Sequence, residues 1–375
     1  MEWGRSVRSE WRLDPNFLTV NHGSFGATPL CVRAAQDAWR ERMEAQPTLF
    51  MADVNGLLRA GADRLGAFLG ADGRDIVFTD NATTGCNAVL RSLTLKPDDE
   101  ILMLSHVYGA VRNTVRFVTE RAGARMTEAI VPFPAFSEDA VVAAVLAALT
   151  PRTRLAVIDH IASDSALVMP AARIVAACHA ADVLVLSDGA HAPAQIDLDL
   201  TAIGADFYAG NGHKWLCAPK GSAFLWVAPG QQEAVHPTVI SHGLDQGFLT
   251  EFDWTGTRDP SAALSVSAAL DFHERLGGAR MRKRNIALAA EAAALIARRL
   301  NTEAVLTGGA MGLVRLPWHG SPLDLRARLM AAGTDAPVHA IGRANWLRLS
   351  AFAYNDLDDF DRLSGLVARV IRDGS

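Results

Sequence analysis

The sequence has few lysines, few cysteines and no long apolar run, and each shortage excludes a class of protein. Only four of its 36 basic residues are lysine, and its 41 acidic residues leave no basic excess to hold a nucleic acid. Its four cysteines are dispersed without a CxxC pair, which argues against a disulfide framework or a zinc ribbon. The apolar runs, such as Ala140 to Leu149, are shorter than the ~20 residues of a membrane helix, and the N-terminus is too polar for a signal peptide. We therefore expect a reduced, soluble, cytoplasmic protein.

Signatures of several common enzyme sites are also missing. The sequence has no HExxH, no GxxxxGK[ST] and no GxSxG, and its histidines lack the spacing of metal ligands. We expect no catalytic metal. No GxGxxG follows a predicted strand, which argues against a nicotinamide-dependent oxidoreductase, a rival interpretation of the fold.

The 375 residues, half of them hydrophobic, suffice for a two-domain enzyme. In the first two-thirds, short β-branched runs alternate with alanine-rich helical stretches. The predicted strands are Ile76–Thr79, Ile101–Leu104, Ala129–Pro132, Leu155–Ile158, Val183–Leu186, Asp206–Ala209 and Ala223–Val227. The predicted helices among them are Asn87–Leu93, Val111–Ala122, Glu138–Leu149 and Ala171–Ala181. This alternation predicts an α/β fold with a mostly parallel seven-stranded sheet covered by helices on both faces. No helix separates the last two strands, so at least one strand should run antiparallel.

The pattern changes after about Pro260. Two long helices are predicted there, Ala262–Leu276 and Ala279–Leu300. They are followed by a strand Leu313–Leu316, a helix Leu323–Ala332, strands near Val338 and at Leu347–Ser350, and a helix Asp356–Arg372. We therefore expect a large domain over residues 1–259 and a smaller C-terminal α/β domain over residues 260–375.

Polar side chains follow five of the predicted strands. In open α/β sheets the ligand binds outside the carboxyl ends of the strands, so these side chains should meet at one edge. They include Asp80 to Gly85, Ser105 to Tyr108, Asp159 to Ser163, Ser187 to His191 and Gly210 to Trp215. The sequence predicts a ligand site at this edge.

One of the four lysines stands at that edge. Lys96 lies in a turn and Lys283 on a basic helix surface, while Lys220, between Pro219 and Gly221, is explained by turn chemistry. Lys214 alone directly follows a buried strand at the ligand edge. Desolvation would depress its pKa and favour a nucleophilic amine.

A carboxylate on an earlier strand end matches this lysine. Asp188 follows the most hydrophobic strand; alone it could simply cap a helix, but paired with Lys214 it meets the needs of pyridoxal phosphate, namely an amine and an acidic partner for the pyridine nitrogen. The segment Thr79–Gly85 could cradle the phosphate through Thr83 and Thr84, although an ordinary helix cap explains it equally well. Tyr108 could stack on the ring or could be ordinary packing.

Six short blocks occur in order along the chain. They are Val20–Gly26, Asn81–Gly85, Ser187–Pro193, Ala209–Gly221, Trp254–Asp259, and Arg348–Ser350 with Tyr354 and Asn355. Together they resemble the class V aminotransferase family, and most closely its isopenicillin N epimerase-like branch, over residues 16–372. The resemblance implies a pyridoxal 5'-phosphate enzyme of fold type I.

The resemblance also implies roles for the matching residues. Lys214 would form an aldimine with the cofactor and move the Cα proton, Asp188 would pair with the pyridine nitrogen, and Tyr108 would stack on the ring. His191 would lie near the ring hydroxyl, and Thr83, His213 and the backbone near Ala82 would hold the phosphate. Thr84 and Thr257 would complete the cofactor-binding set. The substrate-binding residues would be Arg348, which suits an α-carboxylate, Asn21, His22 and Ser163. Thr257 would reach the phosphate of a neighbouring subunit, which implies a homodimer with active sites at the interface.

The reaction stays open among several that begin with Cα–H cleavage of an amino acid. Epimerisation needs a second acid, for which His22, Tyr108, His242 and Tyr354 are candidates. β-Elimination by a Cβ–S lyase and transamination are alternatives. Cysteine desulfurases are also similar, but they carry a nucleophilic cysteine upstream of the carboxylate arginine, and residues 318–347 contain none. A non-catalytic PLP-binding regulator is a further alternative, against which the retained Lys214, Asp188 and Arg348 argue.

Overall fold

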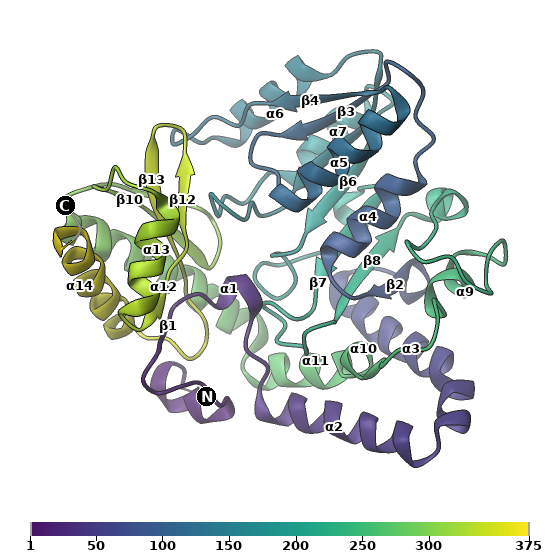
Figure 1. Ribbon diagram of the computed structural model, residues 1–375, viewed down its shortest axis with the longest axis horizontal. Helices are drawn as coiled ribbons and strands as arrows, with labels where there is room; N and C mark the ends of the chain where they lie inside the picture. The colour runs from purple at the N-terminus through teal and green to yellow at the C-terminus, as the bar shows by residue number, and fades with distance from the viewer. Residues whose placement is uncertain (1, 374–375) are drawn as a thin grey trace.

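The computed structural model describes residues 2–373, which form a seven-stranded sheet, a four-stranded sheet and a short two-stranded one, with helices packed around them (Figure 1). The larger sheet has seven strands in the order β2-β8-β7-β6-β5-β3-β4. The strands are β2 (Ile76–Thr79), β3 (Glu100–Leu104), β4 (Arg125–Ala129), β5 (Thr153–Asp159), β6 (Leu184–Gly189), β7 (Phe207–Asn211) and β8 (Ala223–Val227). All neighbours pair in parallel except β8, which runs antiparallel to both β7 and β2. The predicted fold class, with an antiparallel strand at the end of the series, is confirmed.

One predicted strand is misplaced. The apolar run Ala129–Pro132 was expected to form it, but β4 pairs with β3 through Arg125–Ala129 and ends where that run begins. Because β4 is the edge strand, Arg125, Met126 and Glu128 are exposed there, and a strand of this kind lacks the apolar signal of a central one.

Helices cover both faces of the large sheet. On one face α4 (Ala82–Ser92) and α5 (Gly109–Ala122) bury side chains against alternate residues of the strands, such as Val77, Met103 and Leu225. On the other face lie α6 (Glu138–Ala148) and α7 (Ala171–His179), together with the long α3 (Pro47–Leu69). Neither α3 nor the preceding α2 (Leu30–Ala45) was predicted; α3 begins with proline in its first turn and ends at Gly70, in the left-handed conformation that favours glycine.

The smaller sheet has four strands in the order β12-β13-β10-β9, all antiparallel. They are β9 (Ala304–Val305), β10 (Met311–Leu316), β12 (Val338–Ile341) and β13 (Ala344–Ser350). Its core is shared with α12 (Gly278–Leu300), α13 (Pro322–Ala331) and α14 (Leu357–Asp373). Strand β9 was not predicted, and the other elements match the predicted ones to within a few residues.

The predicted helix Ala262–Leu276 is divided in two. The segments are α10 (Ser261–Leu264) and α11 (Val266–Arg275), with a break at Ser265, whose hydroxyl donates to the carbonyl of Ser261. Both pack against α2 and α3. The division of the chain into domains at residue 260 stays a prediction.

The N-terminal segment connects the two sheets. Strand β1 (Leu18–Thr19) pairs in parallel with β11 (Thr334–Asp335), and Asn21 forms a bridge with Ser350. Helix α1 (His22–Phe25) then places the chain against the segment after β7. Gly26 at φ +67° closes this contact, because a Cβ there would lie 2.1 Å from the carbonyl oxygen of His213. Among residues 2–373, no helix is both long and apolar enough to cross a membrane.

Candidate active site

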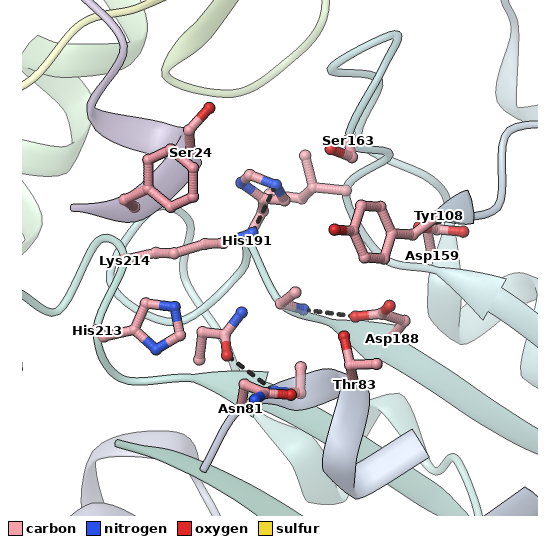
Figure 2. Close-up of a pocket in the computed structure, with 15 residues that line it drawn as sticks. Ser24, Asn81, Thr83, Tyr108, Asp159, Ser163, Asp188, His191, His213 and Lys214 are labelled. Atoms are coloured by element: carbon pink, nitrogen blue, oxygen red, sulfur yellow. Dashed lines mark hydrogen bonds between the residues drawn. The ribbon is translucent and has the colours of Figure 1, made fainter. Parts of the chain in front are cut away.

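A cavity of about 370 Å³ opens at the carboxyl edge of the large sheet (Figure 2). Its walls come from the ends of β2, β3, β5, β6 and β7 and from helix α1, as the edge position of the predicted site requires. The lining residues are Ser24, Phe25, Asn81, Ala82, Thr83, Tyr108, Asp159, Ile161, Ser163, Asp188, Ala190, His191, Asn211, His213 and Lys214.

Lys214 brings an amine into this cavity (Figure 2). Its Nζ lies 3.0 Å from Nε2 of His191. Burial lowers the pKa of Lys214 to about 8. The charge of Asp188 acts in the opposite direction, and the charge of Arg348 lowers the pKa further. Burial also lowers the pKa of His191 well below its ordinary value, so this ring is neutral. A far larger fraction of Lys214 is therefore the free amine near neutral pH than at the ordinary pKa of lysine, which favours nucleophilic chemistry.

Two carboxylates face the lysine from neighbouring strands. Asp188 on β6 and Asp159 at the end of β5 are register partners, and each is 3% exposed. Oδ1 of Asp188 accepts the N–H of Ala190 at 3.0 Å, and Oδ1 of Asp159 accepts the N–H of Tyr108 at 3.2 Å. Burial raises the pKa of both side chains, and the charge of Asp188 raises the pKa of Asp159 further.

Helix α4 begins at the opposite wall of the cavity. Asn81 caps it, accepting the N–H of Thr84 at 2.9 Å and the Thr84 hydroxyl at 3.2 Å. The N–H of Ala82 donates to Oδ1 of Asn211 at 2.9 Å. Within the described chain no protein partner takes the N–H or the hydroxyl of Thr83, which lines the cavity. Of the predicted anion cradle, Ala82 and Thr83 reach the cavity, whereas Thr84 serves the cap.

Tyr108 and His213 occupy two further walls. Tyr108 caps α5 without a side-chain bond, is 44% exposed and, in Figure 2, lies across the cavity from Lys214. His213 shares a hydrogen bond of 3.3 Å with the carbonyl of Ser222, and burial lowers its pKa to about 4. Both residues line the cavity, at the ligand edge where the sequence placed them.

Arg348 reaches the border of the cavity from the smaller sheet. It is not a lining residue, but its guanidinium donates to Ser24 Oγ at 2.9 Å and to the carbonyl of Ser163, both of which belong to lining residues. It also donates to Oδ1 of Asn21 at 3.2 Å. Burial lowers the pKa of Arg348 to about 10, and its Nε has no partner. Arg348 thus retains one unused buried donor beside the site.

His22 and Thr257, like Thr84 and Asn21, do not line the cavity. The ring of His22 shares hydrogen bonds with Tyr354 Oη at 2.9 Å and with the carbonyl of Lys214 at 3.1 Å, and it stacks on Phe352. Burial lowers the pKa of His22 to about 3, so it supports the backbone of Lys214 as a neutral ring. Thr257 is exposed and lines no part of the cavity.

Sequence reasoning gave no role to several lining residues. Asp159 was expected at the ligand edge with the other residues that follow its strand, but it was given no role, although it ends β5 where its register partner Asp188 nears the end of β6. Asn211 is the last residue of β7 and fixes the first N–H of α4. Ser24 and Phe25 line the cavity because α1 packs against the segment at Lys214, and no local sequence pattern predicts a contact between such distant parts of the chain.

The chain matches known proteins over nearly its whole length. The sequence profile of the family described as Aminotransferase class-V matches residues 47–313. A putative L-cysteine desulfhydrase 1 of Oryza sativa subsp. japonica is 34% identical, with 95% of this chain and 83% of the relative aligned. An isopenicillin N epimerase of Streptomyces clavuligerus is 32% identical, with 97% of each chain aligned.

Solved structures share the fold. The cysteine desulfurase CsdA from Escherichia coli superposes with a TM-score of 0.81 at 20% identity, covering 98% of each chain. The cystine C-S lyase C-DES, in complex with cysteine persulfide, gives a TM-score of 0.81 at 22% identity, covering 95% of this chain and 98% of the other. At these identities the likeness establishes the fold alone.

Proposed function

Because the chain belongs to the class V aminotransferase family, whose enzymes depend on pyridoxal 5'-phosphate, we propose that it uses this cofactor to cleave the Cα–H bond of an α-amino acid. The observation that carries the proposal is the amine of Lys214, with its pKa lowered to about 8, in one cavity with the buried carboxylate of Asp188. This pair supplies the nucleophile and the acidic partner that the cofactor needs.

The residues present fit the cofactor. The cavity of about 370 Å³ holds a flat ring-sized ligand, and its polar groups stand apart on different walls. Asp188 would pair with the ring nitrogen, Thr83 and His213 would hold the phosphate, and Tyr108 would cover one face of the ring. The N–H and hydroxyl of Thr83, at the start of α4, are the free donors that such a phosphate requires.

The side chains around the cavity divide the work of the reaction. When bound, pyridoxal phosphate supplies an electron sink for the bond that breaks at Cα. Lys214 takes the Cα proton through Nζ when the reaction runs in one direction and delivers it when the reaction runs in the other, and the neutral ring of His191 positions that amine. Arg348 donates hydrogen bonds to Ser24 and Ser163 at the border of the cavity, and from there it binds the substrate carboxylate.

Epimerisation is the reaction that we propose, with Lys214 and Tyr108 as the two proton-transferring groups. Among the candidate second acids, His22 and Tyr354 are buried and bonded to each other, and His242 does not line the cavity. Tyr108 does line it, across from the lysine. β-Elimination from a cysteine-like amino acid is the second candidate, favoured by the 34% identity to a putative cysteine desulfhydrase.

We also propose that the protein is a homodimer and that it acts in the cytoplasm. Thr257 is exposed. It lies near the start of α4, since Nη1 of the adjacent Arg258 is 3.7 Å from Oδ1 of Asp80. From this position it is available to a second subunit.

Reduction of the cofactor onto the protein tests the proposal. The purified chain should take up pyridoxal phosphate with a visible absorbance band, and borohydride should fix the cofactor to Lys214, as peptide mass mapping would reveal. Lys283→Ala, a change at an exposed lysine on α12, should behave as wild type, whereas Lys214→Ala should give no reducible adduct. An adduct that persisted in Lys214→Ala would overturn the assignment.

The fate of the amino acid distinguishes the two reactions. In deuterated water, exchange at Cα with inversion would support epimerisation. Pyruvate and sulfide formed from L-cysteine would instead support β-elimination. An amino-acid panel that gave neither exchange nor elimination would contradict Cα–H cleavage.

A further inference from the structure

The two buried carboxyl groups at the ends of β5 and β6 form a pair. Asp159 and Asp188 are register partners on parallel strands, and neighbouring in-register residues point to the same face of a sheet with their backbones about 5 Å apart. Each side chain is 3% exposed and both line the same cavity. Two carboxylates so placed cannot both be ionised without strong mutual repulsion.

Asp159 has an oxygen that the protein leaves without a partner. Its Oδ1 accepts the N–H of Tyr108, but its Oδ2 is buried and makes no hydrogen bond. Leaving a charged oxygen buried and unbonded is costly, whereas a protonated oxygen can donate to a ligand in the cavity. The unpartnered Oδ2 therefore indicates that a bound ligand supplies its hydrogen-bond acceptor.

The charges around the pair cannot neutralise both members. Lys214 is the cation that faces them, and its amine is itself partly neutral near pH 8. The thiol of Cys86 on α4 and the phenol of Tyr208 on β7 also adjoin the pair, and burial keeps both uncharged by raising their pKa values. Asp164, further along the loop after β5, adds negative charge.

We propose that Asp159 keeps its proton in the working enzyme and donates a hydrogen bond from Oδ2 to the ring oxygen of bound pyridoxal phosphate, while Asp188 carries the negative charge. The assignment rests on the proposed function. It makes Asp159 a positioning residue for the cofactor ring, with no proton leaving it during the reaction.

The surroundings decide which member holds the proton. The charge of Lys214 interacts more strongly with Asp188 than with Asp159, and the ionisation of Asp159 is opposed first by burial and then by the charge of Asp188. Asp188 must also be ionised to stabilise a protonated ring nitrogen. A second anion at Asp159 would repel an oxygen of the ligand, and a neutral carboxylic acid would instead bind it.

Substitutions that keep or remove a neutral donor test the hydrogen bond. Asp159→Asn retains a donor of nearly the same shape without charge, so cofactor affinity, measured by equilibrium titration without substrate, should stay within a few-fold of wild type. Asp159→Ala removes the donor and should weaken cofactor binding roughly ten- to a hundredfold. Asp188→Asn, a charge-removing control at the paired position, should weaken it markedly although it too keeps a donor.

Infrared spectroscopy of the protein loaded with pyridoxal phosphate, in the absence of substrate, tests the proton itself. At pH 7.5, the difference spectrum between wild type and Asp159→Asn should contain the carbonyl band of a protonated carboxylic acid. A carboxylate band in its place would overturn the proposal. This measurement needs no active enzyme and is independent of the folding of Asp159→Ala.

The outcomes separate this proposal from the proposed function. A wild-type chain that bound no pyridoxal phosphate would overturn both the function and the hydrogen bond to the ring. A chain that bound it, but in which Asp159→Asn was as weak as Asp159→Ala, would overturn the role of Asp159 alone. Loss of affinity in Asp159→Ala only in the presence of an amino acid would place the acceptor on the substrate and contradict the ring oxygen.

Discussion

At the scale of single residues, the site depends on burial that changes the protonation of its ionisable groups. Lys214, His191 and His213 all have lowered pKa values because desolvation disfavours their charged forms. Asp159 and Asp188 have raised values for the same reason. The result is neutral imidazoles around an amine that is partly neutral near pH 8, which is what an amine nucleophile needs at ordinary pH.

The pH dependence of cofactor uptake should report the lysine directly. Only the neutral amine attacks an aldehyde, so the rate of cofactor uptake by the cofactor-free protein should rise with pH and level off above about 8, the pKa of Lys214. At the usual pKa of lysine, the rise would continue past pH 10. Stopped-flow absorbance would follow the rate from pH 6.5 to 10.5.

A control and a contrary result accompany this experiment. Lys96→Ala, which changes an exposed lysine in a turn, should leave the pH profile unaltered. A rate that still increased tenfold per pH unit between 8.5 and 10 would contradict the lowered pKa.

The residues of the site were predictable where chemistry follows a strand end and unpredictable where it depends on distant contacts. Lys214, Asp188 and Tyr108 lie at the cavity because each follows a strand of the large sheet. His22 could not be placed, since its orientation is set by Tyr354 and Phe352 from the far end of the chain. The roles of all these residues stay predictions.

At the scale of elements, the close approach of β6 and β7 beside Asp188 depends on a missing side chain. A Cβ on Gly189 would lie 2.1 Å from the ring of Tyr208, which is fully buried and bonded to His160 at 2.8 Å. The ring therefore has no free space into which it could move. Gly189 keeps the two strands, and with them the carboxylate of Asp188, in register.

Two glycine-to-alanine changes of opposite effect test this packing. Gly189→Ala should lower the free energy of unfolding by about 1–3 kcal/mol through overpacking, and should also weaken cofactor binding. Gly56→Ala, in an exposed part of α3 with open space around it, should raise the free energy of unfolding by about 0.5–1 kcal/mol. Urea unfolding would measure both; equal midpoints for Gly189→Ala and wild type would contradict the close contact.

The elements themselves could be predicted in proportion to their burial. The central strands β5 and β6 are apolar on both faces, and their positions agree with the sequence to within a few residues. The edge strand β4 and the break between α10 and α11 could not be read locally, because pairing and packing decide where they begin and end. The helices α2 and α3 were missed although α3 carries a regular buried face.

At the scale of the whole molecule, the N-terminal segment and the smaller sheet complete a site that the large sheet begins. The segment pairs with β11, bridges to Ser350 and contacts the carbonyl of Lys214 through His22. Arg348 of β13 donates hydrogen bonds to Ser163 in the loop after β5 of the large sheet and to Ser24 on α1. Lys214, which follows β7, and Arg348 of β13 therefore come from different sheets, and the same N-terminal segment contacts both of them.

A second subunit is the remaining part of the proposed assembly. Between β8 and α9 (Phe248–Asp253), the side chains of Val239 and Ile240 are 55% exposed and that of Leu244 is 44% exposed, a grouping of apolar surface typical of protein interfaces.

Light scattering should give a mass of twice 40.1 kDa. Ile240→Asp should shift the protein towards monomer by burying a charge at the interface. Leu306→Asp, at a leucine that is 82% exposed beyond β9, should leave the dimer intact. A wild-type monomer at micromolar concentration would contradict the proposed homodimer.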